Sequence, residues 1–453
     1  MPFRFVITLY NLVLPLAILL LLPRQLIKMF RRGNFQRNFG QRFGSYSPQI
    51  RAWLREHPAP VWIHAVSVGE VLVALKLIRA LRGRDAALPI VLSTTTTTGF
   101  ELAEKNAGLG FLPMYRPIDL PACVYWAFEA IRPRLLILVE SELWPNTLAA
   151  AAIRRIPIAL VNARLSPRSE RRFRRFAALS RPLFQKLDFV LTQTPTDIDR
   201  WAALGVPRHR LQHSGSIKFD QEGAVPPRSQ IETFRRMLQD LRGEDARGPV
   251  LLAGSTHPGE EKLIGKAVLA ILEKIPGLWF VAVPRHFERG EEVRQDLASL
   301  GFTPVLKTEI DATQPPRAEG AHPCLIVNTT GELNAWYHLA DVVFVGKTFL
   351  SREGQNPVEA LLAGKPIITG PEMKNFDELF QRLRSAGGVL RLETLGELET
   401  ATLRLLQDPG LQQDIVRNGS AVVQADQGAT ERSAGLLMGM IQPATSASSH
   451  LFA

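Results

Sequence analysis

The sequence predicts an α/β protein with two domains, each built on a parallel sheet, and three observations lead to this prediction. Short apolar runs alternate with longer segments that carry apolar residues at helical spacing, which is the pattern of repeated strand and helix units. A polar, proline-bearing passage from Asp220 to Gly248 interrupts this alternation once. The chain has 453 residues, 46% of them hydrophobic, which fits two medium-sized cores better than one.

The first series of predicted strands lies between Pro60 and about Gly215. Each is a short, mostly apolar run, as expected of a buried strand. These runs are Val61 to Val66, Ile90 to Thr94, Gly110 to Tyr115, Leu135 to Val139, Pro157 to Asn162 and Phe189 to Gln193. Helical segments are expected between them, for example over Val71 to Leu81.

The second series follows the polar passage. Its strands are expected at Pro249 to Ala253, Trp279 to Val283, Cys324 to Val327, Asp341 to Val345 and Pro366 to Thr369. The domains are therefore predicted at residues 33–219 and 249–442, with a linker at 220–248 and a disordered tail rich in serine and alanine at 443–453. Two domains joined in this way predict a cleft in which two substrates could meet.

Residues 1–32 are predicted to form a membrane anchor with a basic flank. The run from Phe5 to Pro23 has no charged side chain and is just long enough to cross a bilayer. Only Arg4 precedes it, whereas six cations follow without an acid between them, which predicts that the rest of the chain is cytoplasmic. Asn11 and Pro15 leave open a half-inserted helix that lies in one leaflet. The six cations are Arg24, Lys28, Arg31, Arg32, Arg37 and Arg42.

The net charge of +11 predicts an anionic partner, such as anionic lipid, a phosphorylated substrate or nucleic acid. One basic strip contains a single acid, Glu170, and could bind acceptor phosphates or lipid headgroups, although a solvated helix face fits it equally well. Aromatic residues do not interleave with the strip and no nucleic-acid signature is present, so no nucleic-acid partner is expected. The strip comprises Arg164, Arg168, Arg171, Arg172, Arg174, Arg175 and Arg181.

Several function classes lose support. Cys123 and Cys324 lie far apart without zinc-ligand spacing, so neither a disulfide framework nor a metal site is expected, and a reducing compartment fits best. No GxGxxG or GxxxxGK[ST] motif joins a strand to a helix, which disfavours hydride transfer and ATP hydrolysis. Asp197 and Asp199 look like the acidic pair of metal-using sugar transferases. They fall in a predicted helix, however, where they are expected on a solvated face.

Acidic residues follow two predicted strands of the first domain. Glu70 comes after a strand and a glycine at the start of a helix, where it could be a general base or merely complement the helix end. Glu140 and Glu142 follow the strand Leu135 to Val139. Acids gathered in a crevice can raise one another's pKa, although ordinary helix caps could also explain them.

The second domain repeats a pattern of strand, polar turn and helix four times. The segments are Gly254 to Glu260, Pro284 to His286, Asn328 to Leu333 and Gly354 to Ala360. Backbone N–H groups at helix starts can hold phosphate, an arginine can pair with it, and a carboxylate can accept hydrogen bonds from ribose. Together they predict a nucleotide site, whereas a plain serine or threonine N-cap is the simpler interpretation of the first segment.

In several sequence blocks the chain resembles a known family, the Kdo transferases, which add 3-deoxy-D-manno-oct-2-ulosonic acid (Kdo) to lipid A precursor. The resemblance implies a GT-B fold and an inverting reaction that needs neither metal nor cofactor. It also implies CMP-Kdo as donor, the glucosamine disaccharide of lipid IVA as acceptor, and a place on the cytoplasmic face of the inner membrane. The matching blocks are His64 to Glu70, Glu140 to Asn146, Asn162 to Ser166, Gly215 to Asp220, Pro284 to His286, Gly331 to Leu333 and Asn356 to Glu359.

The resemblance also implies roles for single residues. Glu70 matches the proton acceptor, and Glu140 and Lys218 match transition-state stabilisers. Gly346 to Phe349 and Gln355 depart from the family pattern. The positions that match CMP contacts are Pro284, Arg285, Thr330, Gly331, Glu332, Asn356, Pro357, Val358 and Glu359.

Two other functions stay open from the sequence. One is a membrane-associated GT-B transferase that uses a UDP-sugar on a lipid acceptor, which nucleotide preference would separate from a CMP-Kdo enzyme. The other is a membrane-tethered scaffold that binds nucleic acid or lipid, which the arginines and the pI of about 9.9 would suit.

Overall fold

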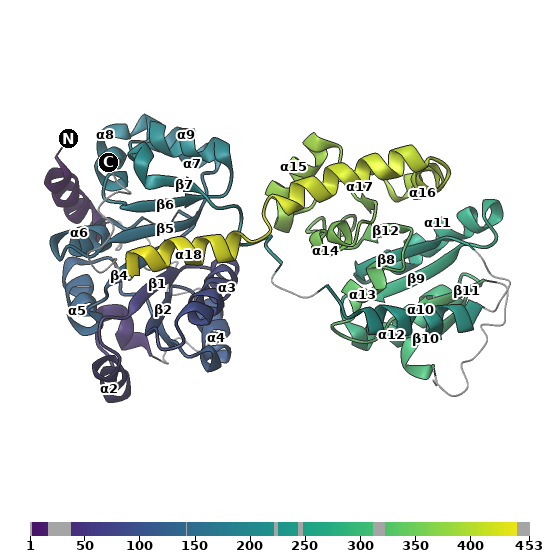
Figure 1. Cartoon of the computed structure of the whole chain (residues 1–453), viewed down its shortest axis with the longest axis horizontal. Helices are drawn as coiled ribbons and strands as arrows, with labels where there is room; N and C mark the ends of the chain where they lie inside the picture. Colours follow the sequence, from purple (N-terminus) through teal and green to yellow (C-terminus); the bar gives the residue numbers. More distant parts are fainter. Residues whose placement is uncertain are drawn as a thin grey trace. The chain divides into compact units, whose positions relative to one another are not determined.

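The computed structural model describes residues 2–16, 38–141, 143–221, 225–242, 248–310 and 322–441. The chain forms two compact units, one made of Met1–Asp220 and Asp426–Ala453 and the other of Gln221–Ala425 (Figure 1). Each unit contains a seven-stranded sheet whose strands pair in parallel. The prediction of two Rossmann-like domains, as the GT-B resemblance implies, is confirmed.

The first sheet has the strand order β3-β2-β1-β4-β5-β6-β7. The order reverses between β1 and β4, and in such sheets ligands bind outside the carboxyl ends of the strands at this switch point. The short edge strand β7 was not predicted, because only the first of its three residues is buried. The strands are β1 (Val61–Ala65), β2 (Ile90–Thr94), β3 (Leu112–Tyr115), β4 (Leu135–Val139), β5 (Ile158–Ala163), β6 (Phe189–Thr192) and β7 (Leu211–His213).

The helices of the first unit begin at sequence signals that fix their starts. Proline stands in the first turn of α2, α5, α6, α7 and α9, and a serine or threonine hydroxyl caps α2, α3, α4, α7 and α9. The helices are α2 (Pro48–Glu56), α3 (Val68–Arg84), α4 (Thr97–Lys105), α5 (Pro121–Ile131), α6 (Pro145–Ile153), α7 (Pro167–Arg175), α8 (Ala177–Phe184) and α9 (Pro195–Ala203), with 3-10 turns η1 (Phe39–Phe43), η2 (Ala107–Leu109) and η3 (Arg208–Arg210).

The second sheet has the order β10-β11-β9-β8-β12-β13-β14, and its edge strands β10 and β14 were not predicted. Both edges are only partly buried, so their sequences lack a continuous apolar run. The strands are β8 (Val250–Thr256), β9 (Trp279–Pro284), β10 (Thr303–Leu306), β11 (Pro323–Ile326), β12 (Val342–Val345), β13 (Ile367–Thr369) and β14 (Leu390–Arg391).

Helices cover this second sheet, and the first of them, α10, lies within residues 220–248, which corrects the expectation that this passage is only a linker. They are α10 (Arg228–Arg242), α11 (Glu260–Lys274), α12 (Gly290–Ala298), α13 (Leu333–Tyr337), α14 (Val358–Leu362), α15 (Asp377–Ala386), α16 (Leu398–Gln407) and α17 (Pro409–Gln424), with 3-10 turns η4 (Phe287–Arg289), η5 (Lys307–Glu309), η6 (Lys374–Phe376) and η7 (Leu395–Glu397).

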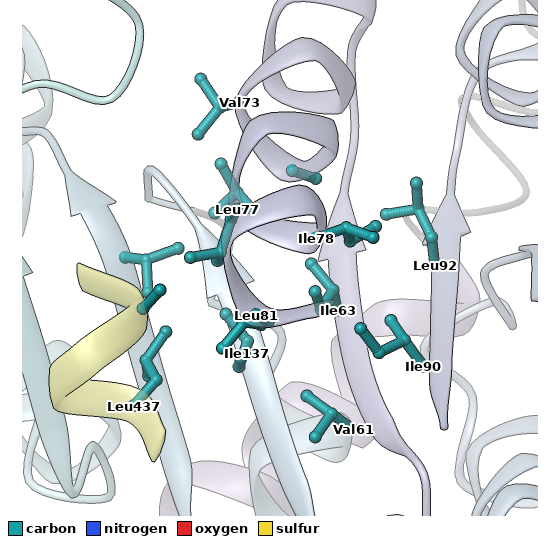
Figure 2. Packing of buried hydrophobic residues seen from close by; sticks show 14 of the residues in the cluster. Val61, Ile63, Val73, Leu77, Ile78, Leu81, Ile90, Leu92, Ile137 and Leu437 are labelled. Carbon is teal, nitrogen blue, oxygen red and sulfur yellow. The ribbon is translucent and has the colours of Figure 1, made fainter. Parts of the chain in front are cut away.

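The last helix, α18 (Ala429–Ile441), belongs to the first unit, which corrects the expected end of the second domain at residue 442. Its Leu437 lies in the same buried cluster as Leu77 and Leu81 of α3 and Ile137 of β4 (Figure 2). The sequence did not signal this return, because an apolar helix face does not specify which of two sheets it covers. The expected tail at residues 443–453 lies outside the described residues.

At the other end of the chain, residues 3–16 form a helix that lies beside the start of α6 (Figure 1). The described residues include no helix that is both long and apolar enough to span a membrane. Most of the basic flank, and the end of the apolar run beyond residue 16, lie outside the described residues.

The packing of α18 predicts an effect on stability. Leu437→Ala removes a fully buried side chain from the cluster shared with α3, so the free energy of unfolding should fall by about 2–5 kcal/mol. Gly439→Ala on the same helix is the control. Gly439 is exposed with open space around its Cα, so alanine should raise the free energy by about 0.5–1 kcal/mol. Denaturant unfolding of both variants tests this, and equal stabilities would refute the assigned packing.

Candidate functional site

Glu70 lies in the first turn of α3, directly after the carboxyl end of β1. One carboxylate oxygen accepts a hydrogen bond from the Val66 backbone N–H at 2.8 Å, and the other accepts one from the Ser67 hydroxyl at 2.9 Å. Ser67 caps α3 in return by accepting the Glu70 N–H. Glu70 thus does complement the start of its helix. The same contacts also fix a largely buried carboxylate at the switch point.

Glu140 follows β4, the neighbour of β1. Its φ of 63° is unusual for a residue other than glycine, and its backbone is held by β5, because the Glu140 N–H donates to the Val161 carbonyl at 2.9 Å. Burial raises the pKa of the Glu140 carboxyl, while the positive charges of Arg164 and Lys218 oppose the rise. The structure therefore brings together three residues that the sequence singled out, Glu140, Arg164 and Lys218. Glu142 lies outside the described residues.

The turn that carries Lys218 is held from two sides. Asn162, which is buried and has a φ of 53°, accepts the Ile217 N–H at 3.0 Å. Lys76 of α3 donates to the carbonyl oxygens of Ile217 at 3.1 Å, Lys218 at 3.3 Å and Asp220 at 2.5 Å. Sequence reasoning missed Lys76, although a cation among the buried positions of an apolar helix was a usable signal.

A buried polar network supports the other end of the turn after β4. Asp119 accepts the backbone N–H groups of Asn146 and Thr147, each at 3.0 Å, and so caps α6, whose own N-cap residue, Trp144, makes no side-chain capping bond. Arg116 pairs with Asp119 at 3.2 Å and lies 3.9 Å from the centre of the Trp144 ring. Burial raises the pKa of Asp119, and the charge of Arg116 opposes this rise. Sequence reasoning did not find this pair.

His64 is the first residue of the motif His64 to Glu70, and its contacts indicate a structural role. Its Nδ1 lies 3.1 Å from both the carbonyl and the hydroxyl oxygen of Ser93. Burial, with the nearby charge of Arg116, lowers the pKa of His64 well below its ordinary value. The ring is therefore neutral at physiological pH and cannot supply a positive charge to the site.

The basic strip divides into two parts. Arg164 is half-buried beside Glu140, whereas Arg168, Arg171 and Arg172 are exposed on α7. The acid of the strip, Glu170, is bound to Arg200 at 2.7 Å and to Arg174 at 2.8 Å, and hydrogen bonding to Arg200 lowers its pKa. The exposed arginines of α7 thus form an anion-attracting face separate from the Glu140 group.

In the second unit, the expected nucleotide contacts lie at the carboxyl ends of adjacent strands. Pro284 ends β9 and is followed by the exposed Arg285, while Thr330 and Gly331 follow β11. Gly331 has a φ of 78°, which glycine adopts without strain. Glu332 is paired with Lys307 at 2.9 Å and accepts a hydrogen bond from Thr329, so its carboxylate also holds its own turn in place.

The segment after β12 carries the remaining residues that are expected to contact the nucleotide. Asn356 accepts the Val358 N–H at 3.1 Å, and Pro357 precedes α14. Glu359 lies in the first turn of α14, where burial raises its pKa while a hydrogen bond from Gln221 opposes the rise. Strands β11, β9, β8 and β12 are neighbours in the sheet, so all four predicted segments lie at one edge.

The segment after β8 differs from its predicted form. Neither Ser255 nor Thr256 caps α11, which begins after Gly259 at a φ of 84° without a side-chain cap. Instead, the buried Glu260 accepts backbone N–H groups from His257 at 3.0 Å and Lys347 at 2.7 Å, so the His257 N–H donates within the protein. The serine or threonine cap is therefore wrong, because Ser255 and Thr256 still belong to β8 and Gly259 stands at the N-cap position of α11.

Gln355, one of the departures from the family pattern, lies against this segment, with its side-chain nitrogen 3.2 Å from Nε2 of His257. The other departure, the turn Gly346 to Phe349, is held by Glu260, which also accepts the Thr348 N–H at 3.2 Å. Both departures thus contact the segment after β8.

Asp197 is not on a solvated helix face, which corrects that expectation. It is buried, exchanges hydrogen bonds with Thr194 at the start of α9, and pairs with Arg200 at 2.7 Å. Asp199 is exposed as expected and pairs with Arg208 at 2.5 Å. Within the described ranges, no group of three or more histidine, cysteine, aspartate or glutamate side chains could hold a metal ion, and both cysteines are free and buried.

Comparison with known proteins gives consistent matches. A family model for 3-deoxy-D-manno-octulosonic-acid transferase (kdotransferase) matches residues 37–221. The transferase of that name from Haemophilus influenzae is 32% identical over 381 residues, which cover 84% of this chain and 87% of that protein. The Bordetella pertussis transferase is 33% identical over 383 residues, covering 83% and 86%. Among solved structures, the C-terminal CMP-Kdo binding domain of WaaA from Acinetobacter baumannii is 25% identical, covers 43% of this chain and 98% of that domain, and has a TM-score of 0.39.

Proposed function

The chain belongs to the Kdo transferase family and is a glycosyltransferase, and on this premise we propose that it moves Kdo from CMP-Kdo to the glucosamine disaccharide of lipid IVA. One observation of the structure carries the proposal. Glu70 and Glu140 follow the adjacent strands β1 and β4 at the switch point of the first sheet, and Glu140 is accompanied by Arg164 and Lys218. A carboxylate beside a cationic cluster suits transfer of an acidic sugar to a hydroxyl group.

In the proposed reaction, Glu70 is the general base. A hydroxyl oxygen of the acceptor attacks the anomeric carbon of Kdo as its proton passes to the Glu70 carboxylate, and the bond from that carbon to the CMP phosphate oxygen breaks. CMP leaves with the electron pair of that bond. A single displacement of this kind inverts the anomeric configuration. The hydrogen bonds from the Val66 N–H and the Ser67 hydroxyl support the role of Glu70 because they fix the carboxylate before the acceptor arrives.

The charges of the reaction are matched by side chains, so the proposed mechanism uses neither a metal nor a cofactor. Kdo brings its own carboxylate, which Lys218 and Arg164 suit, and Glu140 sets their orientation through its charge. In the second unit, the exposed Arg285 suits the phosphate of CMP and Glu359 suits the ribose hydroxyls. The exposed Arg168, Arg171 and Arg172 suit the phosphates of the acceptor.

The decisive experiment tests both the proposed transfer reaction and the role of Glu70 as general base. Parent enzyme, with lipid IVA and CMP-Kdo that has been generated beforehand, should give a product heavier by Kdo and with inverted anomeric configuration. The yield should be undiminished when a chelator is added together with lipid IVA, after the CMP-Kdo has formed. Glu70→Gln should reduce turnover by a factor of at least about 100, because the amide cannot accept the proton. Its melting temperature should stay close to the parent value, since a glutamine side chain of the same size can also hydrogen-bond to the Val66 N–H and the Ser67 hydroxyl.

Ser67→Ala is the matched control, because it removes the Ser67 cap of α3 and keeps the carboxylate, which the Val66 N–H still holds. It should cost about 1 kcal/mol of stability and leave most of the activity. A folded Glu70→Gln enzyme with near-normal turnover would refute the base assignment. A parent enzyme that forms no Kdo product would refute the function itself.

Donor binding gives a separate prediction. Arg285→Ala and Glu359→Ala should each weaken CMP binding about tenfold or more, because a charged hydrogen-bond partner is lost. Lys274→Ala is the control, since this exposed cation lies at the far end of α11 and pairs with Glu399. Calorimetric titration with CMP, UMP and UDP tests this. Unchanged CMP affinity in both variants would mean that the donor site lies elsewhere. Tighter binding of UDP than of CMP would favour the alternative of a UDP-sugar transferase.

We further propose that the protein is attached to the cytoplasmic face of the inner membrane through its N-terminal segment. Five large apolar side chains lie on one face of the helix at residues 3–16 and are each at least 38% exposed, whereas Val6 is buried. An apolar face of this kind is costly in water and suits a lipid surface, to which the arginines of α7 would add attraction for anionic headgroups. The residues of this face are Phe5, Leu9, Leu12, Val13 and Leu16.

Leu12→Asp should therefore reduce binding of the full chain to vesicles of anionic phospholipid by about tenfold or more, because a charge replaces the most exposed apolar side chain of the helix. Thr8→Ala is the control, since the Thr8 hydroxyl bonds within the helix to the Arg4 carbonyl. Vesicle flotation measures both. Full binding by Leu12→Asp, or activity of a carboxyl-terminal reporter in the periplasm, would contradict the proposed attachment.

A further inference from the structure

The N-terminal helix at residues 3–16 contacts the first unit through polar groups as well as apolar ones. Val6 is buried on its inner face. One turn further along, the side-chain amides of Asn11 and Asn146 form a reciprocal pair, with N–O distances of 3.0 and 2.7 Å. A paired amide fixes the helix both along its axis and in rotation, which apolar packing alone would not do.

Asn146 connects this helix to the buried network around Asp119. Its side-chain amide also donates to the Asp119 carbonyl at 2.5 Å, and its backbone N–H donates to the Asp119 carboxylate at 3.0 Å. Tyr10, next to Asn11, is hydrogen-bonded to the same carboxylate. Burial and the charge of Asp119 raise the pKa of Tyr10, so the phenol stays protonated and can donate.

The same network ends at the turn that carries Glu140. The turn that carries Glu140 leads from β4 to α6, so the position of Glu140 depends on where α6 begins. Asp119 fixes that start by capping α6, and Arg116, which is bound to Asp119, lies against the Trp144 ring. The contacts therefore run without a gap from Asn11 through Asn146 and Asp119 to the residues beside the Glu140 turn.

We propose that Asn11 and Tyr10 are positioning residues for the transfer reaction, and that the helix at residues 3–16 must be docked for the Glu140 turn to hold its working geometry. The inference rests on the proposed function for the role of Glu140. It gives the helix a second role, because a segment that only attached the enzyme to a membrane would need no buried amide pair on its protein-facing side.

Asn11→Ala tests the proposal in the full-length chain, assayed in detergent with dispersed acceptor so that recruitment to a membrane does not limit the rate. We expect kcat to fall about tenfold while the KM for CMP-Kdo changes less than about twofold, because the lost contact acts on geometry and not on donor binding. Backbone amide exchange at Asn146 and Thr147 should be faster than in the parent. Tyr10→Phe, which removes only the hydroxyl, should change kcat and exchange in the same direction.

Thr8→Ala is again the control, since it removes a side-chain hydrogen bond within the same helix and should leave kcat and exchange at parental values. Parental kcat in Asn11→Ala would overturn the proposal, whether or not exchange changes, and so would unchanged exchange at Asn146. If the parent itself transfers no Kdo, the proposed function has failed, and exchange alone then decides whether the helix holds the turn.

Discussion

The structure of the first unit depends on the parallel pairing of β1 with β4. These strands run side by side from Val61 opposite Leu135 to His64 opposite Leu138, although α3, β2, α4, β3 and α5 separate them in sequence. Because the register is fixed, the turns that follow the two strands leave the sheet next to each other. This pairing places two carboxylates at one edge of the sheet, and the buried faces of both strands make a shift of register costly.

Much of this arrangement could be predicted from the sequence. The buried strand Leu135–Val139 is a continuous apolar run and Ile90–Thr94 begins with three apolar residues, and the predicted bounds of both agree with the observed ones. The edge strands β7, β10 and β14 were missed because short, half-buried strands have no such run. Glu140 and Lys218 could be named from the resemblance, whereas Lys76 and Asp119 could not. Their partners lie far away along the chain, and nothing in a single sequence reveals such pairings.

Buried carboxylates hold the loops of both units. Asp119 accepts two backbone N–H groups at the start of α6, Glu260 does the same for residues 347 and 348, and Asp220 accepts the N–H groups of Gly428 and Thr430. A buried charge is costly unless hydrogen bonds satisfy it, so each of these acids stabilises one loop conformation over the alternatives. Rigid loops around a reacting centre reduce the reorganisation that the reaction would otherwise require.

The return of α18 makes the second unit an insertion within the first. The chain leaves the first unit after Asp220 and re-enters it at Asp426, and the bond of 2.8 Å from the Gly428 N–H to the Asp220 carboxylate brings exit and entry together. The order of synthesis then has a consequence. The cluster around Leu77 and Leu81 lacks its covering helix until the last part of the chain has left the ribosome, whereas the second unit is complete well before. The nascent first unit must therefore keep an apolar face of α3 uncovered during the synthesis of more than two hundred further residues, and exposed apolar surface of this kind favours aggregation.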